Sequence, residues 1–427
     1  MSEWESIESS SFPKKWKLKS LDQYMQEGRG ICYGIVQPGF PDESGIPVIR
    51  VNNLRSGRIV SDDVLKVSAE IESQYSRSRL RGNEILISLV GNVGEIVIVD
   101  SQYQGWNVAR AIGVIPINDD IDKIWLKYWL QSAQIQQYIK TRCNTTVQIT
   151  LNLKDVSTLP ILEPSLEEQG LISSIPFALD RKISNLRQQN ETLERIAQTL
   201  FKHWFVDFEF PNEDGKPYKS SGGEMVRSEL GEIPAGWHIG KLGDVVNVNA
   251  KSISNGYKHT NIEYIDISSV GIGNLEGTSS YRLKDAPSRA RRLVTHGNVI
   301  WSGVRPNRKS YLFISHPPDN LVVSTGFITL TPNLIPSSYL YSWVTTDSFV
   351  EYLTFNASGS AYPAVKAEHF EIADVLLPEK LILNKFHGVV DTMREKIYQN
   401  ALQIQTLTKT RDVLLPKLMS GKLRITE

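Results

Sequence analysis

The sequence predicts an α+β protein with two pseudo-symmetric α/β-mixed domains, separated by an antiparallel two-helix coiled coil. Three observations support this fold class. The second half of the chain repeats the first half in order, each half begins with short strand-like segments, and each half ends in a heptad pattern. At 427 residues the chain is long enough for several domains of ordinary size.

The repeat consists of five matching blocks that keep their order. The offset between the matched blocks drifts only from 221 to 214 residues. The pairs are 13–21 with 234–242, 48–59 with 264–275, 82–86 with 297–301, 108–115 with 323–330, and 151–164 with 365–378. Two β-rich stretches can also match by chance, but the nearly constant register favours a duplication.

Each half opens with apolar, β-branched runs that are interrupted by Gly, Pro and Asn. Such runs, for example 85-ILISLV-90 and 321-LVVSTGFITL-330, are typical of short strands joined by turns. One helix-like stretch lies late in each domain, at 124–139 and at 338–353. Each domain is therefore expected to be α+β with one conspicuous helix.

A narrow seam follows each domain, with the spacing 4-3-4-3-4-3-4 of a coiled coil. The first seam contains Leu179, Ile183, Leu186, Asn190, Leu193, Ala197, Leu200 and Trp204. The second contains Met393, Ile397, Asn400, Ile404, Leu407, Arg411, Leu414 and Leu418. The matching phase favours pairing of the two helices, antiparallel if a pseudo-twofold axis lies across them. Packing of each helix on its own domain is the alternative.

Composition excludes several classes of protein. With 41% hydrophobic and 22% charged residues the chain is globular, and its two cysteines, Cys32 and Cys143, form no zinc-ligand or disulfide pattern. Apolar runs are far shorter than the ~20 residues of a membrane helix, so a cytoplasmic location is expected. The sequence contains no P-loop and no dinucleotide-binding fingerprint. It also lacks the Asn/Asp-Pro-Pro-aromatic tetrapeptide with which amino-methylating enzymes hold a flipped base, so we expect no catalytic residue and no metal site.

Basic and amide side chains gather in loops of both domains, although the formal net charge is zero. Arginine and asparagine read base edges in the major groove, and other cations position phosphates. A solvated basic face is the alternative. The candidate DNA-binding residues are Arg50, Asn52, Asn53, Arg55, Arg79, Arg81, Asn92, Arg289, Arg291, Arg292, Arg305, Asn307, Arg308 and Lys309.

Four segments resemble a known family. The run 193-LERIAQTLFKHWFVDFEFP-211 with 229-ELGEIPAGW-237 is similar to the central conserved region of specificity subunits of type I restriction-modification systems. The segments 356–378 and 409–425 resemble the end of a target-recognition domain and the C-terminal conserved region of that family. The matching loop of the first half, 143–152, lacks the Gly-Ser start found at 358–366.

The resemblance implies a chain in which two target-recognition domains read a bipartite DNA target. It assigns 1–165 to the first such domain, 166–206 to the central spacer helix, 207–236 to a linker, 237–379 to the second domain and 380–427 to the C-terminal spacer helix. It also implies a non-catalytic subunit that binds double-stranded DNA, two methyltransferase subunits and restriction/translocase subunits. The cofactors S-adenosylmethionine, ATP and Mg would then be used by those partners, with none in this chain.

The stretch 194-ERIAQTLFKHWF-205 carries more apolar side chains than the seam needs. Ile196, Phe201 and Phe205 lie off the seam, and we expect them to dock a methyltransferase subunit. Two other functions remain open from the sequence. One is a single-chain DNA methyltransferase or nuclease without recognisable motifs, and the other is a protein-interaction adaptor that does not contact DNA.

Overall fold

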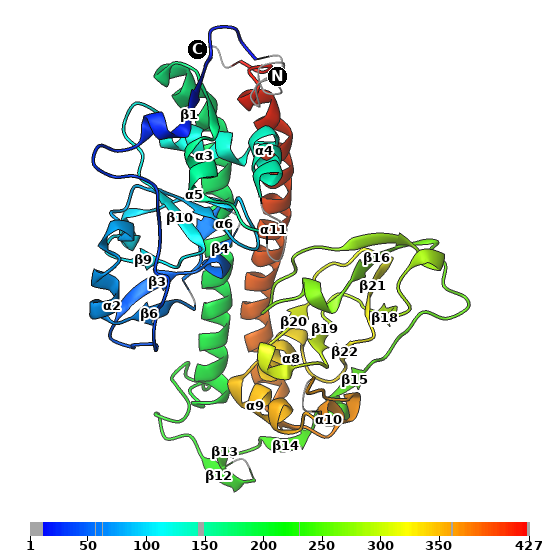
Figure 1. Cartoon of the computed structure of the whole chain (residues 1–427). Helices are drawn as coiled ribbons and strands as arrows, with labels where there is room; N and C mark the ends of the chain where they lie inside the picture. Colours follow the sequence, from blue (N-terminus) through cyan, green and yellow to red (C-terminus); the bar gives the residue numbers. More distant parts are fainter. Residues whose placement is uncertain are drawn as a thin grey trace. The chain divides into compact units, whose positions relative to one another are not determined.

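The computed structural model describes residues 12–55, 57–61, 63–143, 149–229, 231–359 and 362–424. It divides into two compact units. The first consists of Met1–Asn185 with Ile404–Glu427, and the second consists of Leu186–Gln403. Each unit therefore holds one strand-rich domain together with a part of each long helix (Figure 1).

The first unit is built on two small sheets and two strand pairs. The four-stranded sheet has the order β2 (Cys32–Tyr33), β10 (Ile112–Ile115), β7 (Ile85–Ser88) and β8 (Ile96–Ile98). The three-stranded sheet has the order β6 (Leu65–Val67), β3 (Ile46–Ile49) and β9 (Asn107–Val108). Two antiparallel pairs complete the unit: β1 (Lys17–Ser20) with β11 (Pro160–Glu163), and β4 (Leu54–Arg55) with β5 (Arg58–Ile59).

The second unit repeats this plan. One sheet has the order β15 (Val246–Val248), β22 (Phe327–Pro332), β19 (Val299–Ser302) and β20 (Tyr311–Phe313). The other has the order β17 (Ser279–Arg282), β16 (Asn261–Ile265), β21 (Leu321–Ser324) and β18 (Ala290–Leu293). The remaining pairs are β14 (His238–Lys241) with β23 (Asp374–Leu377), and the linker hairpin of β12 (Met225–Ser228) with β13 (Gly231–Pro234).

The two units share one topology, which confirms the predicted duplication. In each unit a parallel pair is flanked by an antiparallel strand: β3 runs parallel to β9, and β16 runs parallel to β21. The central strands β7 and β19 begin at Ile85 and Val299, 214 residues apart (299 minus 85). Among the described residues, β18 is an addition of the second unit.

Short helices follow the strands in both units. They are α2 (Ala69–Ser73), α3 (Lys123–Gln131), α4 (Ala133–Arg142) and α5 (Leu153–Ser157) in the first unit, and α7 (Leu242–Val245), α8 (Ser337–Val344), α9 (Asp347–Phe355) and α10 (Ala367–Glu371) in the second. Each single helix expected from the sequence is two helices. Ser132 breaks the first stretch because its hydroxyl caps the new helix, accepting from the Ile135 amide, and Thr346 caps α9 in the same way.

The long helices are α6 (Leu166–Phe205) and α11 (Lys380–Met419), each of 40 residues. In the second unit they run antiparallel, because Asn190 contacts Asn400 while Glu194, further along α6, contacts the earlier Arg394. In the first unit Asp180 of α6 contacts Arg411 of α11. These contacts confirm the pairing of the two helices. The predicted seam residues are all buried or half-buried, and Ala197, Leu200 and Trp204 also pack in the core of the second unit.

Both domains pack a large apolar core against their share of the helices. In the first unit Trp125 and Trp129 of α3 are fully buried together with Leu418 of α11. In the second unit the corresponding core contains Tyr339 of α8, Phe386 of α11 and Phe205 of α6. Burial of such side chains contributes roughly 1.5–3 kcal/mol each, so the helix segments are integral parts of the domains.

Candidate nucleic-acid interface

The loop between β19 and β20 presents cations of the second unit on a fixed backbone. A short 3-10 helix, Pro306–Arg308, is flanked by Arg305 and Lys309, which have φ angles of 52° and 55°. Left-handed conformations are strained in residues with a Cβ, so the loop must be held by its contacts. The Arg305 amide donates to the Pro363 carbonyl at 2.7 Å, and Lys309 Nζ lies 2.7 Å from Asp347 Oδ1.

The side chains of this loop differ in exposure, since Arg305 and Lys309 are half-buried whereas Asn307 and Arg308 are exposed. The Arg305 guanidinium carbon lies 4.5 Å from the ring centroid of Tyr362, a cation–π contact that orients the fork. Tyr362 itself is 68% exposed, and Asn307 and Arg308 are also exposed. Arginine forks bind guanine edges and phosphates in two-point contacts. The loop can therefore present two arginines and an amide to a nucleic acid.

A second group of cations lies at the beginning of β18. Arg289 and Arg291 are exposed, whereas Arg292 is half-buried and its Nη1 donates to the Ser252 hydroxyl at 3.4 Å. Burial lowers the pKa of Arg292. We therefore assign Arg292 to the packing of the sheet, and of the three predicted arginines only Arg289 and Arg291 are available to a ligand.

Backbone hydrogen bonds join the two cationic groups of the second unit. The Thr325 amide donates to the Arg289 carbonyl at 2.8 Å, and the Gly303 amide donates to the Gly326 carbonyl at 2.9 Å. Because Gly303 begins the loop that carries Arg305, the turn at Thr325 and Gly326 lies between the two groups. The sequence placed these residues in one cluster, and the structure brings them to one edge of the domain.

An acidic group also lies beside Arg289. Partial burial alone would raise the pKa of Asp266, but hydrogen bonds from the Ser268 amide and hydroxyl and from Tyr264, with the charge of Arg289, lower it. Asp266 therefore stays ionised and fixes the turn that follows β16. A carboxylate at this edge would accept hydrogen bonds from cytosine amino groups and would repel phosphates.

In the first unit, Asn53 contradicts the prediction. It is 3% exposed, its Nδ2 donates to the carbonyls of Val60 and Asp63 at 3.0 and 3.1 Å, and its Oδ1 accepts from the Arg50 amide at 2.9 Å. Its amide is thus consumed in holding the loop after β3. Arg50 keeps part of its surface, but its Nη2 lies 2.9 Å from Asp63 Oδ2.

Arg79 serves a buried carboxylate. Its Nε donates to Glu72 Oε1 at 2.8 Å, and its Nη2 contacts Glu72 Oε2. Asn107 Nδ2 also donates to Glu72, at 3.0 Å. The Arg79 hydrogen bonds outweigh the effect of burial and lower the pKa of Glu72. Removal of Arg79 would leave a buried charge unpaired, so any DNA contact by Arg79 would come second to this structural task.

The other predicted residues of the first unit are exposed. These are Asn52, Arg55, Arg81 and Asn92. Sequence reasoning missed Arg110, which is exposed and whose amide donates to the Ile35 carbonyl at 2.8 Å. Arg110 follows β9 as Thr325 follows β21, so the repeat register could have identified it. Residues 144–148 of the loop 143–152 lie outside the described residues.

The loop that carries Arg81 is built around a buried carboxylate. Glu84 accepts from the amides of Arg81, Gly82 and Asn83 at 2.9–3.1 Å and from Arg29 Nη1 at 3.0 Å. Burial alone would raise the pKa of Glu84, but these donors lower it below its ordinary value of 4.5. The carboxylate therefore acts as the anchor of the loop.

We expect Glu84 to make the first unit acid-sensitive. Because its folded-state pKa is lowered, its stabilisation is fully present above pH 4.5 and is lost as the pH falls through the folded-state pKa. Glu84→Gln should lower the free energy of unfolding by about 1–3 kcal/mol at pH 7 and flatten its dependence on pH below 4.5. Urea unfolding at a series of pH values from about 3 to about 7 measures both effects. An unchanged acid slope in Glu84→Gln would contradict this role.

The docking prediction needs correction for two of its three residues. Phe201 and Phe205 are 3% and 2% exposed and pack with Tyr339 and Phe386 in the core of the second unit. They present no surface to a partner, because α8 covers this side of α6. The sequence pattern did not reveal that cover. Ile196 is 46% exposed, so its docking role stays a prediction.

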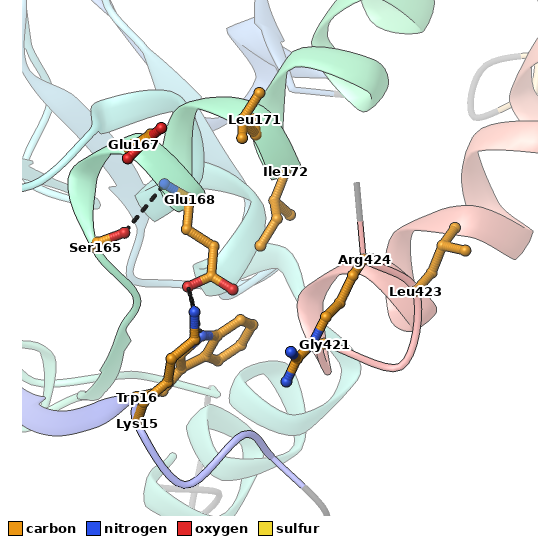
Figure 2. A pocket seen from close by; sticks show the side chains of 10 residues that line it. All are labelled: Lys15, Trp16, Ser165, Glu167, Glu168, Leu171, Ile172, Gly421, Leu423 and Arg424. Atoms are coloured by element: carbon orange, nitrogen blue, oxygen red, sulfur yellow. Dashed lines mark hydrogen bonds and ion pairs between the residues drawn. The ribbon is translucent and has the colours of Figure 1, made fainter. Parts of the chain in front are cut away.

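One pocket lies where α6 begins in the first unit. Figure 2 shows Glu168 reaching from α6 to Lys15 and Trp16, with distances of 3.0 Å to Lys15 Nζ and 3.1 Å from Trp16 Nε1. Gly421 closes the opposite side. Its φ is +68°, and a Cβ there would lie 2.6 Å from Pro13 Cγ. These contacts hold the segment before β1 against the start of α6 and against the turn that follows α11.

The described part of the chain contains neither a metal-ligand cluster nor a helix suited to span a membrane. Within that part of the chain, no three His, Cys, Asp or Glu side chains are grouped so that they could hold a metal ion. No described helix combines the length and the apolar character that crossing a bilayer requires.

Residues 36–195 match the family model of the type I restriction modification DNA specificity domain. The chain is 28% identical over 324 residues to the type I restriction enzyme MjaIX specificity subunit of Methanocaldococcus jannaschii, a match that covers 74% of this chain and 72% of that protein. It is 37% identical over 186 residues to the EcoBI specificity subunit of Escherichia coli, covering 43% of this chain and 39% of that protein. Both relatives are specificity subunits rather than methyltransferases or nucleases.

A solved structure of a type I restriction-modification system S subunit from M. genitalium has the same fold. Its TM-score is 0.53 at 15% sequence identity, and the match covers 95% of this chain and 96% of that chain. The family model, the relatives and this shared fold agree with the resemblance found in the sequence. The chain therefore contains a type I restriction modification DNA specificity domain in residues 36–195 and is related to the specificity subunits of type I restriction systems over most of its length.

Proposed function

We propose that this chain reads a bipartite DNA sequence and scaffolds the catalytic subunits of a type I restriction-modification complex. Each of its two domains reads one half-site, and α6 and α11 set the number of base pairs between the half-sites. Two methyltransferase subunits modify adenine N6 with S-adenosylmethionine, and restriction/translocase subunits use ATP and Mg. The chain itself carries out no chemical step.

One observation carries the proposal more than any other. Equivalent places in the duplicated fold bear exposed basic or amide side chains in both units. The loop after the central strand carries the exposed Asn92 in the first unit, and the exposed Asn307 and Arg308 beside the half-buried Arg305 in the second. In the first unit Arg110 follows β9, a strand of the parallel pair. At the equivalent place after β21 in the second unit, the Thr325 amide donates a hydrogen bond to the Arg289 carbonyl. Two related surfaces of this kind suit two stretches of DNA.

The arrangement also explains how sequence can be read without a net positive charge. Most cations on these edges are arginines. The Tyr362 ring orients Arg305, and backbone hydrogen bonds fix the chain at Arg289 and Arg110, which favours two-point hydrogen bonds to bases over loose phosphate binding. Carboxylates such as Asp266 lie among them and disfavour indiscriminate binding. Partner subunits then supply the remaining contacts to the DNA backbone.

The test measures DNA binding by the methyltransferase-bound complex. Methylation sequencing first identifies the target, and fluorescence anisotropy then follows binding over a salt series. Arg305→Ala with Arg308→Ala should weaken binding about 10- to 100-fold and reduce the salt slope by about one to two. Lys216→Ala with Arg227→Ala, which removes the same charge from the exposed linker, should leave binding unchanged.

The outcome separates the candidate functions. A changed half-site for the second domain, with the other half-site kept, supports the proposal. Equal binding by both double variants would favour the adaptor that does not contact DNA. Methyl transfer by this chain without partner subunits would establish the enzyme alternative instead.

A further inference from the structure

Two ion pairs and an asparagine pair link α6 to α11, and in each of these three contacts the partners occupy non-equivalent positions of the repeat; Asn400 Nδ2 also lies 3.5 Å from Gln189 Oε1. In the first unit Asp180 Oδ1 lies 2.7 Å from Arg411 Nη1. In the second unit Asn400 Nδ2 donates to Asn190 Oδ1 at 2.8 Å, and Glu194 lies 3.7 Å from Arg394. Both acids of these ion pairs come from α6, and both bases come from α11.

The α11 partners in the second unit are buried, whereas Asp180 and Arg411 in the first unit are 22% and 26% exposed, so the second-unit contacts are the more sensitive to their partners. Asn400 is 1% exposed and Arg394 is 8% exposed. The Arg394 guanidinium carbon also lies 4.0 Å from the Tyr341 ring centroid, which holds it against the domain. In the first unit the Tyr128 hydroxyl donates to Asp180 at 2.7 Å. A wrong partner would leave buried polar groups unpaired, which is strongly unfavourable.

The internal repeat shows which residues would face α6 if it paired with the α6 of a second copy. With the offset of 214 residues, Asp180 is equivalent to Arg394 (180 plus 214), and Leu186 is equivalent to Asn400 (186 plus 214). If α6 paired with the α6 of a second copy, Glu194 would face Asp180 and Asn190 would face Leu186. Two acids would meet, and a buried amide would lose its hydrogen bond.

Pairing of α11 with a second α11 fails in the complementary way. Arg411 is equivalent to Ala197 (197 plus 214), and Asn190 is equivalent to Ile404 (190 plus 214). The residue that faces Arg411 would then be Arg394, and Asn400 would face Ile404. Two arginines would meet where the native pairs combine an arginine with a carboxylate, so both homotypic pairs are disfavoured by the same three contacts.

We propose that these residues form a pairing code that makes the first-half helix select the second-half helix and reject a copy of itself. Such a code adds to the difference between the two seams, in which Ala197 and Trp204 of α6 correspond to Arg411 and Leu418 of α11. Polar seam residues and flanking charges are the features that set partner choice in coiled coils. The consequence that every molecule combines two different DNA-reading domains rests on the proposed function, whereas the pairing preference does not.

The experiment uses the whole chain with its linker cut after folding. A protease site is placed in the exposed turn at residues 213–215, and the cut protein is prepared in unlabelled and isotope-labelled forms. The two forms are mixed and warmed until half of the complexes have exchanged partners. Native mass spectrometry then counts one-to-one complexes of the different halves against complexes of identical halves.

Two variants break the code by different means. Asp180→Arg with Arg411→Asp exchanges the two charges of the native ion pair, so the pair between α6 and α11 can still form. The exchange also makes each helix complementary to its own copy. Asn190→Leu with Asn400→Leu is the milder change, because it replaces a polar pair by an apolar one. Gln198→Lys with Lys409→Gln changes charge in the same directions on exposed faces and is the matched control.

The wild type and the control should give almost only complexes of different halves, and each code variant should raise the share of identical-half complexes at least about tenfold. A wild type in which about half of the complexes contain identical halves would overturn the code, since that is the share given by indiscriminate pairing. Code variants that match the wild type would overturn it as well. The readout needs no DNA, so a failure of DNA recognition would be detected separately.

Discussion

Phe205→Ala is expected to lower the free energy of unfolding of the second unit by about 3–5 kcal/mol. The Phe205 ring is 2% exposed, and its centroid lies 4.8 Å from that of Tyr339 and 5.0 Å from that of Phe386. These neighbours come from α8 and α11 and have little freedom to fill the space that the ring leaves. Urea unfolding followed by tryptophan fluorescence measures the loss.

Ile196→Ala provides the matched control on the same helix. Ile196 is 46% exposed, so its truncation should change the free energy of unfolding by less than about 0.5 kcal/mol. Its effect should instead be seen when methyltransferase subunits are titrated onto the intact chain. A Phe205→Ala protein with native stability but weakened assembly would reverse this assignment and restore Phe205 to a docking surface.

The second large effect is expected for Arg394→Met, which keeps the length of the side chain but removes its charge. Arg394 is 8% exposed, pairs with Glu194, and stacks on the rings of Tyr341 and Phe313. Breaking a buried pair on one side leaves the other charge uncompensated, so we expect a loss of about 3 kcal/mol in the free energy of unfolding.

A double-mutant cycle separates the charge from the packing. Adding Glu194→Gln to Arg394→Met removes the unpaired carboxylate and should restore about 1–2 kcal/mol of the loss. Glu194→Gln alone should be the mildest of the three variants, because 27% of the Glu194 side chain is exposed and water can solvate it in part. Strictly additive losses would show that the ion pair contributes nothing beyond stacking.

Much of the architecture could be predicted because repetition and periodicity are recorded directly in the residue order. The seam from Leu179 to Trp204 and its counterpart from Met393 to Leu418 have the burial that their spacing indicates. The breaks at Ser132 and Thr346 were missed, although both residues are good helix caps. Their neighbours keep an apolar pattern on both sides of the cap, so a split helix resembles a single one.

The candidate site was harder to predict because residue type does not record which partner a side chain finds inside its own domain. Asn53 and Arg79 have the chemistry of DNA contacts, yet carbonyl groups and Glu72 occupy them. Those partners lie several residues away and meet them only after the chain folds. Arg110 was missed for the opposite reason, because it stands alone in the sequence and gains meaning only from the strand that it follows.

In the two ion pairs between the long helices, both acids lie on α6 and both bases lie on α11. This arrangement affects what happens when gene segments are exchanged. A crossover in the linker 207–236 transfers a whole domain together with one complete side of the three contacts. The new chain then requires a second half that keeps Asn400, Arg394 and Arg411, and also the core around Tyr339 and Phe386 on which Phe201 and Phe205 pack. New pairs of strand-rich domains can therefore arise in one genetic step wherever these residues of the second half are kept.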